Sequence, residues 1–314
     1  MSREPNAPPP APRDEKSTNG RAGNGPSRGA LPPRVRLLRT GLGLVGPLWP
    51  DGAARVAERL FLSPRRRPRP EAERRILEGA RHLLVPSEYG PIAAWQWGEA
   101  GPQVLLVHGW EGRGAQLGAL GASLAAQGLR AIAFDAPGHG QTAGSISSLL
   151  HFSRAVHAAS AAFGRFHAIV THSMGGPAAV WALAEADLAD RIAMISPPVD
   201  MRDFTRQLSG LLGLGAEVRS AVHRRLAARF GVPMEDLAAD ALAPRMRLPL
   251  LVVHDEEDRE VPIRCGELWA ARWPGASLVR TRGLGHHRIL RDEPVLREIQ
   301  GFVAASLPRR VEAA

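Results

Sequence analysis

Short apolar runs alternate with longer amphipathic stretches from about residue 81 onward. Val104–Val107 and Leu250–Val253 are apolar at every position, as expected of strands covered on both faces of a sheet. Strands that alternate with helices are typical of an α/β fold with a mostly parallel central sheet and helices on both faces. We expect strands over residues 82–85, 92–97, 104–108, 131–134, 168–171, 192–195, 250–254 and 277–280. Helices are expected over residues 115–127, 149–163, 174–186, 263–271 and 293–305.

The alternation stops between residues 195 and 250, where no strand is predicted. Val218, Val222, Leu226 and Phe230 recur at four-residue spacing, which predicts a helix. Four leucines precede this helix: Leu208, Leu211, Leu212 and Leu214. We therefore expect an inserted helical lid at about residues 198–245. Its apolar side chains could face an apolar substrate pocket or pack the lid onto the body, and both interpretations stay open.

The N-terminal part of the chain has a different composition. Residues 1–33 are rich in Pro, Gly, Ala, Asn and Ser without periodicity, which predicts a disordered tail. Residues 34–75 are predicted to form a basic helical segment and linker, with an amphipathic stretch that a Pro- and Arg-rich run ends. We interpret the helix as packed on the main domain rather than as an anchor. The main α/β domain is expected over residues 76–308, with a short tail at 309–314.

The chain has 314 residues and 44% hydrophobic residues, enough for one large domain with an appendage. Its formal net charge is +9, and arginine supplies almost all of it because Lys16 is the only lysine. Many arginines precede residue 76. A basic segment can attract nucleic acid or an anionic membrane surface. No nucleic-acid motif accompanies it, so we predict no nucleic-acid partner and favour a solvated face over peripheral membrane contact.

The number of cysteines indicates in which cellular compartment the protein is expected. Cys265 is the only cysteine and can form no internal disulfide, which favours a reducing, cytoplasmic location. We interpret it as a small buried hydrophobe rather than a nucleophile. No apolar run typical of a secretory signal occurs in residues 1–33. The apolar stretch Leu42–Trp49 is too short to span a bilayer.

The strongest chemical signal is the run Ala-Ile-Val-Thr-His-Ser-Met-Gly-Gly at residues 168–176. An apolar strand leads directly into Ser173, and small residues open the next helix. This is the context of a nucleophile elbow, which exposes the serine hydroxyl above the sheet edge. Thr171 stands where the Gly-x-Ser-x-Gly pattern has its first glycine, so we expect its side chain to crowd the turn. The alternative is a serine in an ordinary strand-to-helix turn.

Two backbone N–H groups are candidates for an oxyanion hole. In folds with such an elbow, the donors are the residue after the nucleophile and a residue in an earlier strand-to-helix loop. Here these are Met174 and Trp110, which follows a predicted strand in the sequence His-Gly-Trp. We assign structural roles to His108, which begins that sequence, and to Asp135 and His139 in a later glycine-rich turn.

The acid partner is expected after the strand at residues 250–254, where several carboxylates occur together. We choose Asp258, which lies three positions before Val261-Pro262. A buried carboxylate that accepts a histidine N–H sets the tautomer of the ring and stabilises its charged form. The neighbouring carboxylates are interpreted as a solvated loop. Asp200 is a less favoured substitute.

The base is expected near the end of the chain, in the sequence Gly-Leu-Gly-His-His. We choose His286 because it directly follows Gly285, and a loop flanked by glycines can place a histidine over the serine. His287 is the alternative. The chain order of nucleophile, acid and base is then Ser173, Asp258, His286.

These motifs together resemble the α/β-hydrolase superfamily over roughly residues 81–308. The resemblance rests on His108–Trp110, Asp135–Gly140, His172–Gly176, Asp258 with the following Val-Pro, and Gly285-His286. It implies the α/β-hydrolase fold and a serine nucleophile, with neither a metal nor an organic cofactor. The motifs are specific for the fold and not for a substrate.

The resemblance and the residues together lead to one expected activity. We expect a serine hydrolase that cleaves an ester or thioester through an acyl-enzyme, acting on a small-molecule substrate with an apolar acyl group. Two alternatives remain: a non-catalytic binding protein with the same fold, and an acyltransferase that uses an acceptor other than water. No oligomeric state is predicted.

Overall fold

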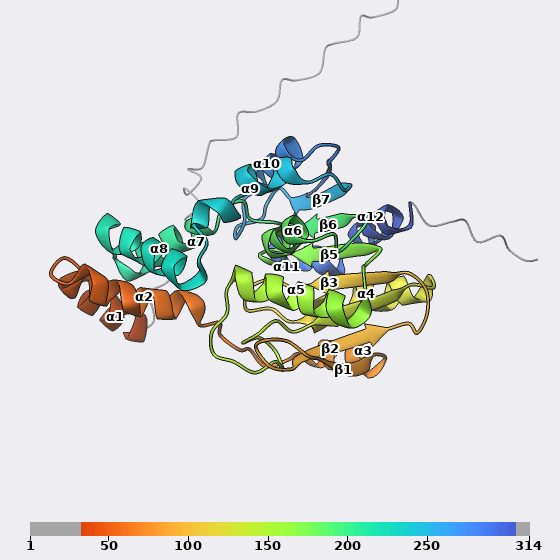
Figure 1. Cartoon of the computed structure of the whole chain (residues 1–314), viewed down its shortest axis with the longest axis horizontal. Helices are drawn as coiled ribbons and strands as arrows, with labels where there is room; N and C mark the ends of the chain where they lie inside the picture. Colours follow the sequence, from red (N-terminus) through yellow and green to blue (C-terminus); the bar gives the residue numbers. More distant parts are fainter. Residues whose placement is uncertain (1–32, 306–314) are drawn as a thin grey trace, which may run out of the picture.

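The computed structural model describes residues 33–305 of the chain. The predicted tails at residues 1–33 and 309–314 lie outside the described residues, except for Pro33, which begins the first helix. Eight strands form one central sheet in the order β1-β2-β4-β3-β5-β6-β7-β8 (Figure 1). The strands are β1 (Arg81–Val85), β2 (Ile92–Trp97), β3 (Gln103–Val107), β4 (Arg130–Phe134), β5 (Ala168–His172), β6 (Ile192–Ile195), β7 (Leu250–Asp255) and β8 (Ser277–Thr281).

The sheet is parallel except at one side. β1 pairs with β2 and β2 with β4 in antiparallel fashion, whereas every pairing from β4 through β3 to β8 is parallel. The predicted mostly parallel sheet is confirmed, with all eight strands within one residue of their expected bounds. β3 has β4 on one side and β5 on the other, so the chain changes direction across the sheet there. In open parallel sheets, ligands bind beyond the carboxyl ends of the strands at such a switch point.

Helices cover both faces of the sheet (Figure 1). Along β3, Leu105 and Val107 belong to one buried cluster while Val104 and Leu106 belong to the other, because successive side chains of a strand point to opposite faces. The helices are α1 (Pro33–Val45), α2 (Pro50–Leu62), α3 (Glu71–Glu78), α4 (Gly118–Ala126), α5 (Leu149–Phe163), α6 (Gly175–Glu185), α7 (Met201–Leu212), α8 (Ala216–Phe230), α9 (Ala239–Leu242), α10 (Arg264–Arg272), α11 (Gly285–Arg288) and α12 (Glu293–Ala304). The short 3-10 helices are η1 (Gly114–Leu117), η2 (Met234–Leu237), η3 (Ala243–Arg245) and η4 (Ile289–Arg291). α5, α6 and α10 contribute to the first cluster, and α4 and α12 to the second.

α3 was not predicted, and the expected boundary between residues 75 and 76 falls inside it. This helix packs on α4 and η1, and Trp97 of β2 donates its indole N–H to the carbonyl of Ile76. Glu73 of α3 binds the guanidinium of Arg113 in a pair that is buried on both sides. α3 is therefore tied into the body of the protein.

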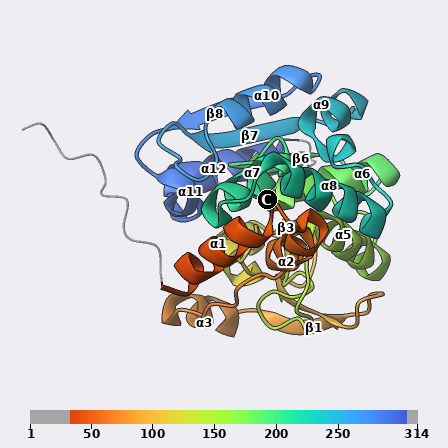
Figure 2. The ribbon, with the colours of Figure 1, turned by 90° about the vertical axis from the view of Figure 1, so that its left-hand side faces the viewer.

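Four helices gather at one end of the molecule, and we call α1, α2, α7 and α8 the helical cap. Figure 2 looks onto this end, with the four cap helices in front of the sheet. α7 and α8 lie in the insertion between β6 and β7, while α1 and α2 come from the N-terminus. α2 packs along α8, and α1 packs on α7. The N-terminal helices therefore rest on the insertion, which lies within the region expected as the main domain, residues 76–308.

Apolar packing between small and large side chains joins α2 to α8. Ala53, Ala54 and Ala57 of α2 are buried, which lets α8 approach closely, and Val218 and Val222 of α8 are buried as well. Two of the four residues of the apolar stripe of α8 thus pack within the cap. The other two, Leu226 and Phe230, line a small apolar cavity between the cap and the body.

Candidate active site

Ser173 occupies the turn between β5 and α6 in a left-handed backbone conformation. Its φ angle is 51°, a region that residues other than glycine seldom adopt and that is often found at functional sites. The Ser173 N–H donates to the carbonyl of Ile195 on β6 at 2.9 Å, which helps to hold the turn. A Cβ atom at Gly175 would lie 2.6 Å from the His108 carbonyl oxygen, so only glycine lets α6 pass so close to the loop after β3.

Thr171 is accommodated at the position where the common pattern has glycine. Its side chain is fully buried, and its hydroxyl lies 3.4 Å from the carbonyl oxygen of Ala193 on β6. Gly176 faces it, and a Cβ atom there would lie 3.4 Å from the Thr171 hydroxyl. The expected crowding is relieved because the opposing residue has no side chain.

Asp258 and His286 are brought together from two separate loops. His286 Nδ1 lies 2.7 Å from Asp258 Oδ2, and the other carboxylate oxygen accepts the N–H groups of Glu260 and Val261, each at 2.9 Å. Burial alone would raise the pKa of Asp258, but the hydrogen bonds from His286 and the two N–H groups lower the pKa to about 2. Asp258 is therefore ionised at neutral pH and fixes Nδ1 as the protonated nitrogen of His286.

The other candidates for acid and base lie elsewhere. His287 is exposed and pairs with Glu260, at 2.9 Å. Asp200 accepts the N–H of Arg202 as the N-cap of α7 and also binds the Arg202 guanidinium. Neither residue takes part in the Asp258–His286 pair.

Asp255 differs from the solvated loop that we expected around Asp258. It ends β7, is fully buried, and accepts hydrogen bonds from Thr281 Oγ1 at 2.8 Å and from the Leu284 N–H at 3.0 Å. Burial alone would raise its pKa, but the donors that surround the carboxylate outweigh it and lower the pKa. Asp255 thereby ties β7 to the loop that leads to His286.

The loop after β3 runs directly beside the serine. A Cβ atom at Gly109 would lie 2.8 Å from Ser173 Cβ, so the two turns touch. Within residues 33–305, the N–H groups of Trp110 and Met174 donate no hydrogen bond and remain available. The next residue, Glu111, has a φ angle of 54°, and its carboxylate accepts the Nε–H of Arg65 at 2.8 Å. The loop that carries Trp110 is thus held by the segment between α2 and α3.

His108 and Asp135 join the loops behind the site, in agreement with the structural roles assigned to them. His108 Nε2 accepts the N–H of Ala136 at 3.0 Å, and its Nδ1 faces the Gly109 carbonyl at 2.6 Å. Asp135 accepts the N–H groups of Gly114 and Gln141, both at 2.7 Å. Burial raises the pKa of Asp135 to about 6, although these donors oppose the shift.

Sequence reasoning missed one contact of the base. His172, directly before the serine, is buried, and its Nε2 lies 3.0 Å from the carbonyl oxygen of His286. The two imidazole rings are 4.6 Å apart between centroids. Burial, reinforced by the neighbouring His286, holds the pKa of His172 well below its usual value. Its position next to Ser173 was the only signal in the sequence.

A cleft of about 990 Å³ contains the serine and the base. Ser173, His286, Trp110 and Phe204 of α7 line it, together with arginines and acidic residues. No hydrogen bond joins Ser173 Oγ to His286 in the described part of the chain, and such contacts often tighten only when substrate binds. The arrangement can present a serine, a histidine with its acid and two backbone donors to one bound molecule.

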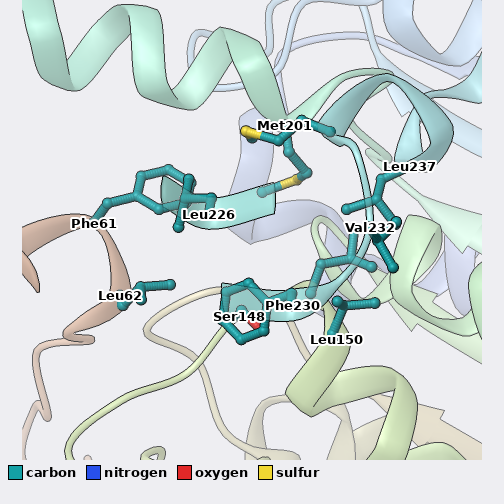
Figure 3. A pocket seen from close by; sticks show the side chains of 11 residues that line it. Phe61, Leu62, Ser148, Leu150, Met201, Leu226, Phe230, Val232 and Leu237 are labelled. Atoms are coloured by element: carbon teal, nitrogen blue, oxygen red, sulfur yellow. The ribbon is translucent and has the colours of Figure 1, made fainter. Parts of the chain in front are cut away.

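A smaller apolar cavity of about 40 Å³ lies between the cap and the body (Figure 3). Phe61 and Leu62 of α2, Leu226 and Phe230 of α8, and Leu150 of α5 converge on it. Its walls therefore come from both halves of the cap as well as from the body.

Cys265 and possible metal ligands lie apart from this chemistry. Cys265 is buried on α10, and its burial raises the pKa of the thiol. Among the residues that the structure describes, no group of three or more His, Cys, Asp or Glu side chains is arranged to hold a metal ion.

The comparisons with known proteins agree with the observed fold. The family model described as the alpha/beta hydrolase family matches residues 104–298. No curated protein matches the chain.

Solved structures with a similar fold include several hydrolases. An esterase from Exiguobacterium antarcticum is 16% identical, with 71% of this chain and 99% of that chain covered and a TM-score of 0.57. An esterase from Rhodococcus sp. ECU1013 is 21% identical, with 73% and 100% covered and a TM-score of 0.55. A bacterial membrane phospholipase A is 20% identical, with 87% and 96% covered and a TM-score of 0.57.

Proposed function

Because the chain belongs to the alpha/beta hydrolase family, we propose that it is a serine hydrolase that cleaves an ester or thioester through an acyl-enzyme. One observation carries the proposal. The left-handed Ser173 lines the same cleft as His286, whose Nδ1 is bound by the buried Asp258 at 2.7 Å. A nucleophile, an oriented base and its acid are the three parts that acyl transfer by serine requires.

In the proposed reaction, His286 Nε2 takes the Ser173 hydroxyl proton as Ser173 Oγ attacks the carbonyl carbon of the substrate. The tetrahedral intermediate then collapses, and the proton on Nε2 passes to the leaving alcohol or thiol. Water attacks the acyl-enzyme with His286 again as the base, and the acid product leaves Ser173 free. Asp258 stays ionised throughout and stabilises the imidazolium, which its low pKa supports.

The negative oxygen of each tetrahedral intermediate would be bound by the N–H groups of Trp110 and Met174. Both are free of other hydrogen bonds within residues 33–305 and belong to turns that touch at Gly109. Loss of one such donor typically slows the reaction by roughly 10²–10³-fold. His172 would act as a positioning residue, since its contact with the His286 carbonyl fixes the segment that carries the base.

We propose an apolar acyl group for the substrate. Trp110 and Phe204 give the cleft an apolar wall beside Ser173 and His286. The cap, which contains the first two helices of the predicted lid, covers this end of the sheet and contributes Phe204 through α7. A panel of p-nitrophenyl esters of increasing chain length would test this, and a clear preference for acetate over longer acyl chains would contradict it.

The first experiment is covalent labelling of the purified protein with a fluorophosphonate, which reacts with an activated serine. We expect labelling of the wild type and its loss in Ser173→Ala and in His286→Ala. Ser196→Ala is a matched control, because Ser196 also has a left-handed backbone, at φ 50°, directly after β6. His287→Ala is the control for the base, and both controls should be labelled like the wild type.

The outcomes separate the alternative functions. Absence of labelling in folded wild-type protein would contradict the hydrolase proposal and favour a binding protein of the same fold. Labelling that survives in Ser173→Ala would place the nucleophile elsewhere. If Ser173 is labelled but an added alcohol captures the acyl group in preference to water, the protein is an acyltransferase.

A further inference from the structure

Exposed apolar side chains are concentrated on the N-terminal half of the cap. Seven of the eleven large apolar side chains that are exposed among the described residues lie on α1, α2 or the turn between them. Leu48 is 88% exposed, Leu37 77%, Leu44 69% and Trp49 61%. Isolated exposed apolar residues are common, whereas a group of large ones marks a contact surface.

The spacing of these residues places them on common faces of their helices. Leu37 and Leu44 are seven residues apart on α1, which is two helical turns, and Leu48 follows in the turn. On α2, Val56 and Leu60 are four residues apart, so they share one face. The buried alanines of α2 pack on α8, and Val56 and Leu60 lie at the edge of this contact, 40% and 39% exposed. The most exposed apolar side chains are therefore those of α1 and of the turn that follows it, and Val56 and Leu60 extend this surface along α2.

Arginines accompany these apolar side chains. Arg36, Arg55 and Arg59 are exposed and form no ion pair with any residue that the structure describes. Glu58, an acidic residue of the same helix, is already bound by Arg225 and Arg229 of α8. The surface thus combines aliphatic side chains, one exposed tryptophan and unpaired cations.

We propose that the outer face of α1 and α2 docks on a bilayer that contains anionic phospholipid. We call this surface the N-terminal apolar face and define it by Leu37, Leu44, Leu48, Trp49, Val56 and Leu60. The leucines would enter the boundary between headgroups and acyl chains, with the tryptophan at headgroup level and the arginines on lipid phosphates.

Charge favours a lipid surface over a second copy of the chain. Two N-terminal apolar faces brought together would also bring their unpaired arginines together, whereas an anionic bilayer neutralises them. Among residues 33–305, no helix has the length and apolar character needed to cross a membrane. A face of this kind lies along the membrane surface.

The test uses the full-length protein and vesicles of phosphatidylcholine, with or without phosphatidylglycerol, in a co-sedimentation assay. We expect binding to the vesicles with phosphatidylglycerol, and weaker binding to those without it or at high salt. The triple variant Leu44→Ser, Leu48→Ser, Trp49→Ser should reduce the partition coefficient by about tenfold or more. All three side chains are exposed, so the variant should melt like the wild type.

A double variant elsewhere provides the control. Leu84→Ser with Tyr89→Ser removes two exposed large side chains outside α1 and α2 and should leave binding unchanged. The proposal is overturned if the wild type does not bind, if the triple variant binds equally well, or if phosphatidylglycerol makes no difference. A dimer in sedimentation velocity that the triple variant dissociates would assign the face to a second copy and also overturn it.

Discussion

The body around the sheet and the helical cap stabilise their polar side chains in different ways. In the body, His108, Asp135 and Asp255 are completely buried and bind defined backbone atoms of neighbouring loops. In the cap, Glu58 is held by two arginines that remain partly in solvent, and large apolar side chains face outward. Directed hydrogen bonds in the body hold the loops in one arrangement, as a catalytic site requires. The cap is instead held together by buried apolar area and by ion pairs.

The largest expected effect is on the turnover rate and concerns the body, which contains the proposed triad. Asp258→Asn would present an amide to His286 Nδ1 and favour the wrong tautomer of the ring. We expect kcat for ester hydrolysis to fall by about 10⁴-fold while the fold is retained, measured by steady-state kinetics with circular dichroism as a check. Asp200→Asn is the matched control because Asp200 caps α7 instead. Near-normal turnover by Asp258→Asn would remove Asp258 from the proposed triad.

A second prediction compares one ion pair in each region. Glu73→Gln leaves Arg113 without its partner, and that arginine side chain is only 8% exposed. We expect a loss of about 3 kcal/mol in the free energy of unfolding. Glu58→Gln should cost only about 1 kcal/mol, because Arg225 and Arg229 keep much of their hydration. Urea denaturation of both variants measures the difference, and equal losses would contradict the distinction between body and cap.

The smallest predicted effect concerns two buried aspartates of the body with opposite pKa shifts. The pKa of Asp135 is raised to about 6, so this residue adds stability as pH falls below 6 and loses it as pH rises through that value. The low pKa of Asp258 acts in the other direction, with stability present above about pH 4 and lost as pH falls through about 2.

Asp135→Asn isolates the first of these contributions. The wild type should lose about 2 kcal/mol of stability relative to Asp135→Asn between pH 4.5 and pH 7, in urea denaturation at the two pH values. A stability difference between the two proteins that does not change with pH would show that Asp135 is ionised over this whole range.

The strands could be predicted because their signals are local, and the proposed catalytic residues were located from the same strand ends. Buried parallel strands are continuous apolar runs, and the loops at their carboxyl ends must meet at one edge of the sheet. The choice between His286 and His287 depended on a single glycine, since adjacent residues share almost the same sequence context. The burial of Asp255 could not be predicted from a run of carboxylates, because it depends on donors supplied by a loop that follows β8.

The cap was the least predictable part of the molecule. The pairing of α2 with α8 joins segments that are far apart in sequence, and neither helix carries a signal for its partner. Amphipathic spacing indicates a helix with an apolar side, but both faces of α2 have apolar residues. Only the packing shows that the small alanines are buried while Val56 and Leu60 remain exposed.

The contact between α2 and α8 also sets an order of events during synthesis of the protein. Roughly 150 residues separate the end of α2 from the start of α8. At about 5–20 residues per second, a ribosome needs roughly 8–30 s to make them. Until then the alanine face of α2 lacks its partner, and Val56 and Leu60 beside it add to the exposed apolar surface. During synthesis, α1 and α2 thus expose apolar surface that chaperones or a nearby membrane could bind before the sheet is complete.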